Sequence, residues 1–241
     1  MNENIYSNIS DLYSHLMRFI DYKKWANYIY KISKEIKDKN IFSLELASGN
    51  CALANYLVDK FYFYVASDLS SNMLVKASAK IKNKVSCNFL ALPFKKKFNF
   101  VFSCFDSVNY LTNKKEFLKM LDEVANILDE NGIFTFDASM ENNSLKYQKY
   151  LNRKGDYKGI KYEQISRYSL KNRIHKNKFI IDFGNGVIKE ETHYQKIYRF
   201  EDYFEMISHS KFSVLKCYEA FSFTNANANS ERIQFVLKKR N

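Results

Sequence analysis

The chain has 241 residues, of which 46% are hydrophobic and 17% aromatic, and this composition excludes an intrinsically disordered protein. Its formal net charge is +12, from 38 Lys and Arg against 26 Asp and Glu, so RNA, an anionic substrate and an acidic protein are the partners to consider. The basic residues are dispersed, with the tightest groups at residues 95–97 and 238–240, so the charge alone does not choose among these partners.

Neither a membrane-spanning segment nor an export signal is expected. No apolar run is long enough to span a bilayer, and the opening MNENIYSNIS lacks the basic start and apolar stretch of a secretory signal. The four cysteines lie far apart, with no Cys-x-x-Cys pair, at Cys51, Cys87, Cys104 and Cys217. We therefore expect a cytoplasmic protein with reduced thiols, no membrane partner and no metal site. No feature of the sequence indicates an oligomeric state.

The first segment of the chain has helical spacing. From Asp11 to Lys39, apolar residues recur every three or four positions, which predicts one broken helix or two consecutive helices. Residues 1–40 are therefore expected to form a helical cap that leads into the main domain.

Strand-like and helix-like segments alternate between residues 41 and 143. Strands are predicted at residues 41–47, 61–67, 85–91, 98–104 and 132–138, and helical patterns lie near residues 53–58, 73–81 and 117–128. The last of these helices is expected to end at Asn131–Gly132 in a left-handed turn. The alternation predicts an α/β fold, in which a mostly parallel sheet is covered on both faces.

The pattern changes after about Ser144. Residues 162–170, 174–183 and 187–198 look like strands joined by short turns, so residues 144–198 are expected to form a small inserted antiparallel sheet. A helix near 200–208 and strands at 212–221 and 232–238 would complete a doubly wound, seven-stranded sheet built from residues 41–143 and 199–241. Glu231 and Arg232 are expected to pin the last strand by an ion pair.

Polar candidates follow several predicted strands. Ligands of open α/β sheets bind beyond the carboxyl ends of the strands, and these ends carry Glu45 with the turn 47–50, then Asp68, Asn88 and Asp106. An acidic residue about twenty positions after a glycine turn can accept both hydroxyls of a ribose, although Asp68 also suits a helix N-cap, and both roles can coexist. The turn lacks further glycines after Gly49, which disfavours a dinucleotide.

Four segments carry a family resemblance. LELASGNCALANYL, YVASDLSSNMLVKAS, FNFVFSCFDSVNYL and LDENGIFTFDAS resemble, in order and spacing, the class I S-adenosylmethionine-dependent methyltransferases, and most closely a bacterial subgroup of the small-molecule type. LYSHLM, DYKKWANYI, HYQKIYRFED and SERIQFVLKK extend the resemblance over nearly the whole chain. It implies a Rossmann-like fold, S-adenosyl-L-methionine as the cofactor, and methyl transfer to N or O of a small polar acceptor beneath the inserted sheet, which would act as a lid.

The resemblance also implies a cofactor site. Asp68 would bind the ribose, Leu69 and Met73 would pack near the adenine, and Glu45 would hold the turn or the ammonium group. The residues of the turn that would pass under the methionine part are Ala47, Ser48, Gly49 and Asn50.

Five further positions complete this implied site. Asn88 takes the place of a family Asp that accepts from the adenine amino group, and Phe89 would cover one face of the ring. Phe105 would lie near the methionine end, while Tyr13 and Trp25 would close the pocket from the N-terminal helices.

Two residues are candidates for the chemistry. The resembling family has a His at the position of His193, which could position the acceptor, remove its proton, or serve as a hydrogen-bonded structural residue. Asp106 could bind an acceptor ammonium, and Tyr110 and Tyr198 could line the pocket. A base is required only when the accepting atom carries a proton, whereas alignment and exclusion of water are always required.

Cys51 departs from the family pattern. It stands where the family usually has a second glycine, and its Cβ could crowd the methionine moiety or only reposition it. Together with Asn88 it leaves open a non-catalytic binding module, and the basic surface leaves open an RNA or protein methyltransferase.

Overall fold

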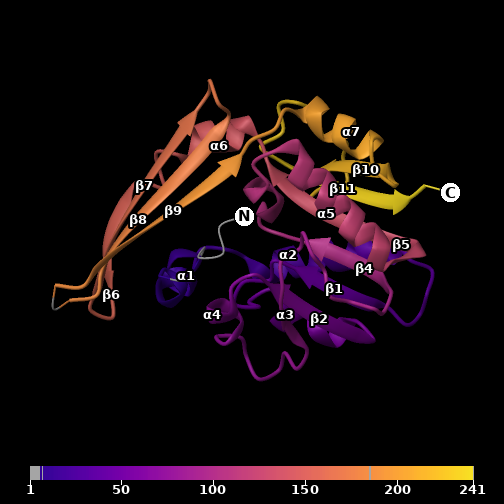
Figure 1. The fold of residues 1–241 in the computed structure, drawn as a ribbon, viewed down its shortest axis with the longest axis horizontal. Helices are drawn as coiled ribbons and strands as arrows, with labels where there is room; N and C mark the ends of the chain where they lie inside the picture. The colour runs from indigo at the N-terminus through magenta and orange to yellow at the C-terminus, as the bar shows by residue number, and fades with distance from the viewer. Residues whose placement is uncertain (1–5, 7, 185, 241) are drawn as a thin grey trace.

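A computed structural model describes residues 6, 8–184 and 186–240, and these form two sheets (Figure 1). The larger has seven strands in the order β10-β11-β5-β4-β1-β2-β3. Strands β1 to β5 are parallel, and β11 runs antiparallel to both β5 and β10. The strands of this sheet are β1 (Phe42–Leu46), β2 (Phe63–Asp68), β3 (Lys84–Ser86), β4 (Phe98–Ser103), β5 (Leu128–Ser139), β10 (Phe212–Glu219) and β11 (Arg232–Lys239). The predicted doubly wound, seven-stranded α/β fold is confirmed.

Helices cover both faces of the seven-stranded sheet. In β4 all six residues are buried; Val101 packs into the cluster under α5 and α7, while Phe100 and Phe102 pack into the cluster under α2 and α3. This alternation explains why a strand covered on both sides reads as a continuous apolar run. The helices are α1 (Ser10–Leu16), α2 (Tyr22–Ile32), α3 (Ala54–Leu57), α4 (Ser71–Leu74), α5 (Lys114–Ile127), α6 (Glu141–Tyr147) and α7 (Phe200–Ser208), with 3₁₀ turns η1 (Ser33–Glu35), η2 (Val58–Lys60) and η3 (Ser107–Tyr110).

The smaller sheet is antiparallel and projects from the core on the side of α1 and α6 (Figure 1). Its strands follow the order β6-β7-β8-β9, namely β6 (Arg153–Tyr157), β7 (Ile160–Ser169), β8 (Ile174–Asp182) and β9 (Ile188–Lys196). Leu12 and Leu16 of α1 pack against Phe179 and Ile181 of this sheet. We call β6–β9 the inserted sheet.

The predicted end of the helix before β5 was wrong. The helix before β5 ends at Ile127, not at Asn131–Gly132, because the fully buried Leu128 already pairs with Phe98 in the sheet. Gly132 lies within β5, where a Cβ would meet the Leu128 side chain at 2.8 Å, so the glycine permits a close approach and not a left-handed turn.

The third strand is shorter than predicted, and one strand was missed. β3 ends at Ser86 because the Asn88 side-chain oxygen accepts the Leu90 N–H (2.9 Å) and turns the chain. β6 was missed because its sequence, RKGDY, has no apolar alternation.

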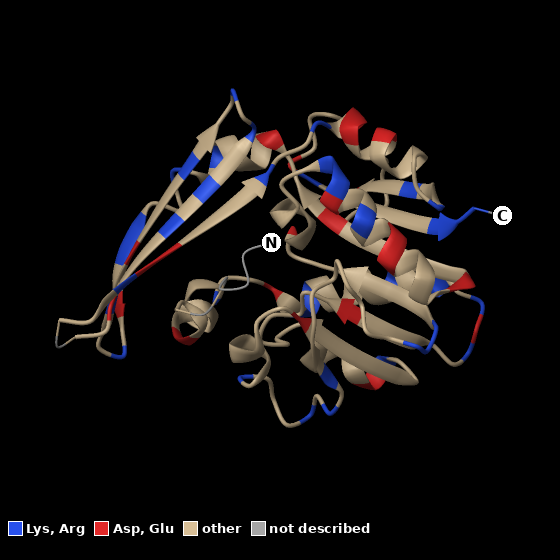
Figure 2. Cartoon of the chain, viewed as in Figure 1, with Lys and Arg blue, Asp and Glu red and all other residues tan. Residues whose placement is uncertain are grey.

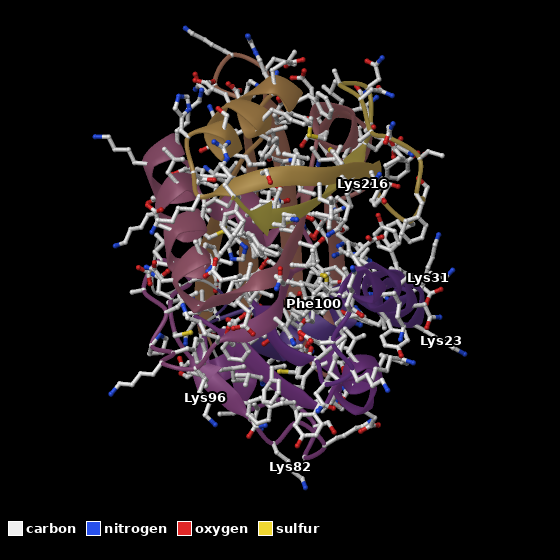
Figure 3. The ribbon with its side chains drawn as sticks, turned by 90° about the vertical axis from the view of Figure 1, so that its right-hand side faces the viewer. Lys23, Lys31, Lys82, Lys96, Phe100 and Lys216 are labelled. Carbon is white, nitrogen blue, oxygen red and sulfur yellow. The ribbon has the colours of Figure 1, made fainter. Side chains whose placement is uncertain are left out.

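Basic side chains are spread around the molecule. Figure 3 shows Phe100 inside the core, whereas the labelled lysines extend outward from separate parts of the chain, at Lys23, Lys31, Lys82, Lys96 and Lys216. None of the described helices is both long enough and apolar enough to cross a bilayer.

Candidate functional site

A cavity lies at the carboxyl ends of β1, β2 and β4, where the strand order reverses on either side of β1. We call it the strand-end cavity. Ten of the residues predicted for a cofactor site line it: Tyr13, Ala47, Ser48, Gly49, Asn50, Asp68, Leu69, Met73, Phe89 and Phe105. The structure therefore brings together residues from five separate regions of the sequence.

The turn after β1 is wound tightly against Asp68. Its backbone is left-handed at Gly49 (φ 56°), and the Gly49 N–H donates to Asp68 Oδ2 at 2.7 Å. A Cβ at Gly49 would stand 3.3 Å from Met73 Cε and 3.8 Å from the Tyr13 hydroxyl. The missing side chain therefore keeps this wall of the cavity open.

Asp68 is held by two backbone groups. Besides the Gly49 N–H, the Ser70 N–H donates to Asp68 Oδ1 at 2.8 Å, and the N-cap of α4 is Ser70, whose hydroxyl accepts from Met73. Burial raises the pKa of Asp68 in spite of these hydrogen bonds. Each carboxylate oxygen retains a lone pair, so Asp68 can accept two further hydrogen bonds from a molecule in the cavity.

A second cavity, of about 630 Å³, lies between the inserted sheet and the core; we call it the inter-sheet cavity. Asp106 and His193 line it, together with Trp25. The residues that line both cavities are Tyr6, Tyr13, Phe105 and Tyr110. The two cavities therefore adjoin.

Comparisons with known proteins agree with this arrangement. Residues 44–132 match the family model described as a methyltransferase domain. The putative methyltransferase YqeM of Bacillus subtilis is 26% identical over 248 residues, covering 98% of this chain and 97% of the relative. The structure of an S-adenosylmethionine-dependent methyltransferase from Clostridium acetobutylicum superposes with a TM-score of 0.80 and 25% identity, covering 98% of this chain and 99% of that one.

Over nearly its whole length the chain is therefore similar to class I S-adenosylmethionine-dependent methyltransferases, and residues 44–132 match the methyltransferase domain. The sugar N-methyltransferase KedS8 from Streptoalloteichus shares the fold, with a TM-score of 0.72 at 14% identity, over 95% of this chain and 92% of that one.

Cys51 does not line the strand-end cavity. Its side chain is fully buried in the cluster under α2 and α3, and its Sγ lies 3.5 Å from the Ser48 hydroxyl. Its φ of 59° is the left-handed conformation that the family's usual glycine adopts freely. Cys51 is thus accommodated by a strained, left-handed backbone and by packing of its side chain behind the turn. It does not take space from the strand-end cavity.

Three predicted cofactor residues lie outside the strand-end cavity. The Asn88 oxygen is engaged by the Leu90 N–H, and Trp25 packs on Phe105 with ring centroids 4.7 Å apart. Glu45 is buried behind the turn and accepts a hydrogen bond from the Tyr64 hydroxyl. Burial raises the pKa of Glu45 to about 8.

Some cavity residues were not singled out from the sequence. Tyr6, Tyr22 and Ser107 line the strand-end cavity; Tyr22 and Ser107 fall within segments that resemble the family, but no residue type or spacing marked any of the three as a site residue. Tyr198, in contrast, donates to the Leu111 carbonyl within the core and lines neither cavity.

His193 belongs to a chain of hydrogen bonds. Its Nδ1 lies 3.0 Å from the Tyr110 hydroxyl, which lies 2.7 Å from the Tyr6 hydroxyl, and its Nε2 lies 2.6 Å from Glu191 Oε1. Burial alone would raise the pKa of Glu191, but hydrogen bonds from His193, Asn8 and Tyr6 lower it. An ionised Glu191 only accepts, so Nε2 carries the hydrogen, Tyr110 donates to Nδ1, and Tyr6 donates to Tyr110.

Asp106 belongs to a second polar cluster. Arg232 pairs with Asp106 (2.6 Å) and with Asp137, and the Gln195 amide donates to Asp106. Burial raises the pKa of Asp137 to about 6, and one of its oxygens has no hydrogen-bond partner. The cluster therefore contains two carboxyl groups and one guanidinium. The predicted Glu231–Arg232 ion pair was wrong, since Glu231 pairs with Lys146.

The raised pKa of Glu45 makes stability depend on pH. The folded state holds the Glu45 proton up to about pH 8, whereas an unfolded Glu loses it near pH 4.3, so stability falls as the pH rises between these values. We expect Glu45→Gln, whose amide oxygen still accepts from Tyr64, to remove the fall in stability between about pH 6.5 and 8. This pH interval lies above the pKa of Asp137, which is about 6. Urea unfolding at both pH values measures the fall in stability, with the exposed Asp122→Asn as control; equal slopes in Glu45→Gln and wild type would contradict this prediction.

Proposed function

We propose that this chain is an active methyltransferase that transfers a methyl group to a small polar acceptor. Of the two acceptor atoms expected from the sequence, nitrogen and oxygen, we propose nitrogen, and the acceptor is then an amine. The observation that carries the proposal is the pair of adjoining cavities, whose shared wall includes the hydroxyl of Tyr110, hydrogen-bonded to His193. S-adenosylmethionine supplies a methyl group on a positively charged sulfur.

The residues that line the strand-end cavity suit this cofactor. Asp68 offers two free lone pairs to the ribose hydroxyls, and Gly49 leaves space for the methionine part beside Met73 and Tyr13. Leu69 and Phe89 supply apolar surface for the adenine. Phe105, which lines both cavities, would stand at the methionine end.

The inter-sheet cavity favours an amine. Asp106 faces it from a cluster in which two carboxylates share one guanidinium, and this excess of negative charge attracts an ammonium group. The neighbour KedS8, which shares the fold, is by its name a sugar N-methyltransferase, and a nitrogen acceptor agrees with that activity. An ammonium nitrogen has no lone pair to accept a methyl group, so its proton must first be removed.

The hydrogen-bond chain provides a route for that proton. Tyr110 accepts the proton from the acceptor while its own hydroxyl proton passes to His193 Nδ1, and Glu191 stabilises the imidazolium that results. Burial raises the pKa of Tyr110, so the phenol transfers protons without persisting as a phenolate. The inserted sheet, which carries His193, would also exclude water from the reacting groups.

Loss of Asp68 should weaken cofactor binding. Hydrogen bonds to a charged group contribute about 1.5–3 kcal/mol, so we expect Asp68→Ala to bind S-adenosylhomocysteine roughly 10- to 100-fold more weakly. Cys51→Gly is the control, because Cys51 lies outside the cavity, and it should bind with unchanged affinity. Calorimetry decides: undiminished binding by Asp68→Ala would refute its role, and a large gain in Cys51→Gly would indicate a decayed site.

Loss of the base should slow transfer without affecting cofactor binding. With radiolabelled S-adenosylmethionine and a panel of amino sugars and other small amines, we expect His193→Gln to reduce kcat by about 10²- to 10⁴-fold. Raising the pH should partly restore its rate, because free amine then forms in solution. A variant whose kcat and pH profile match those of wild type would show that His193 is structural.

A second candidate acceptor is RNA. Figure 2 shows Lys and Arg along the inserted sheet, and Lys161, Lys176 and Lys189 are exposed there. Phosphate contacts from such residues would give an affinity that falls steeply with salt. Unchanged binding of a short RNA between about 50 and 200 mM salt, measured by fluorescence anisotropy, would exclude this candidate.

A further inference from the structure

The inter-sheet cavity holds an arginine with no acidic partner. Arg153, on β6, lines the cavity and is half-buried. Its Nε donates to Gln164 Oε1 at 2.8 Å and its Nη2 donates to the Leu16 carbonyl at 3.3 Å. No carboxylate of the described residues forms an ion pair with it. A guanidinium has five N–H groups, so three of them remain for a ligand.

The surroundings of Arg153 are positive. Burial lowers the pKa of Arg153; Tyr162 acts in the opposite direction, and the charge of Arg18 lowers the pKa further. His15, on the same helix as Leu16, has its pKa lowered by burial and by both arginines. A partly desolvated cation beside another cation is unfavourable unless an anion joins them.

The acidic side chains of the neighbouring elements are engaged elsewhere. Asp11 of α1 pairs with Lys76, and Glu163 of β7 pairs with Lys154. Asp156 of β6 accepts from the Gly159 N–H. None of them neutralises Arg153.

A row of polar side chains connects Arg153 to His193. Arg153 pairs in register with Gln164, Asn177 pairs with His193, and the Gln164 amide donates to Asn177 Oδ1 at 3.3 Å. All four side chains line the inter-sheet cavity from four consecutive strands. Strands lie about 4.8 Å apart and Gln164 stands two residues from the position opposite Asn177, so the ends of the row are about 16 Å apart between backbones. A small molecule can span that length.

We propose that Arg153 binds an oxyanion of the methyl acceptor, a carboxylate or a phosphate, so that the acceptor is a zwitterion with its amine near His193 and Asp106. The planar guanidinium suits either oxyanion because it offers paired N–H groups. This inference rests on the proposed function for the identity of the amine end. The Arg153 site itself requires only that a ligand enters the cavity.

A purely structural role does not require this charge. Ile9, Leu12 and Leu16 already join α1 to the inserted sheet through Tyr162, Phe179 and Ile181. The bond from Arg153 to the Leu16 carbonyl is long, and a neutral donor would serve equally well. These contacts do not explain why the residue at position 153 carries a positive charge.

Matched probes test the proposal without any need for turnover. In the presence of saturating S-adenosylhomocysteine, the full chain is titrated by calorimetry with 6-aminohexyl phosphate, 6-aminohexanoate and 6-aminohexanol. We expect wild type to bind at least one of the two anions about tenfold or more tightly than the alcohol. We expect Arg153→Gln to abolish that preference and Lys171→Gln, an exposed control in the turn between β7 and β8, to retain it.

Each outcome has a distinct meaning. Equal affinities of wild type for the three probes, or an anion preference that survives in Arg153→Gln, would overturn the proposal. If Arg153→Gln weakened binding of a short RNA but not of the anionic amines, the site would serve RNA phosphates and the proposal would also fail. Arg153→Met, which retains the apolar stem, replaces the Gln variant if the latter does not fold. An intact anion preference without methyl transfer to any amine would refute the proposed function alone.

Discussion

The hydrogen bonds that Asp68 accepts are the constraint on which the strand-end cavity depends. One carboxylate oxygen binds the N–H of Gly49, in the turn after β1, and the other binds the N–H of Ser70, at the start of α4. Two loops that follow neighbouring parallel strands are thereby fixed to a single side chain at the end of β2. The buried carboxylate remains favourable because backbone donors compensate for part of its lost hydration.

Glu191 fixes the opposite side of the site. Its carboxylate accepts from His193 and from the N–H groups of Tyr6 and Asn8. The segment before α1 is thus attached to the inserted sheet, and the Tyr6 ring lies across the boundary between the two cavities, where it meets Tyr13 and His193 edge to face. A single buried anion therefore orients the imidazole of His193 and closes the site with the N-terminal segment.

The sequence was sufficient for features that repeat or that stand at strand ends. Continuous apolar runs predict the core sheet because strands covered on both faces must be apolar throughout. Asp68 was found because the carboxyl ends of the strands converge at one edge of a parallel sheet. Tyr6 could not be found in this way, since its hydrogen-bond partners Tyr110 and Glu191 lie more than one hundred positions away in the chain, and the contacts of Glu191 with Tyr6 and Asn8 are equally remote. Arg232 was predicted to pair with its neighbour Glu231, although adjacent residues along an extended chain point to opposite faces. Its partner Asp137 lies opposite Gln234, which is two residues from Arg232 in β11 and therefore on the same face.

The two charged clusters of the inter-sheet cavity differ in origin and sign. The negative one, at Asp106, comes from the ends of β4, β5 and β11, where Phe105 and Asp106 both adopt left-handed backbone conformations. The positive one, at Arg153, comes from the inserted sheet and α1. Left-handed non-glycine residues cost about 1–3 kcal/mol each, so the fold maintains the position of Asp106 against a local preference. Since Arg153 is on the inserted sheet and Asp106 is in the core, a ligand with opposite charges at its two ends would link the two parts of the molecule, and binding would itself hold the inserted sheet over the reacting groups.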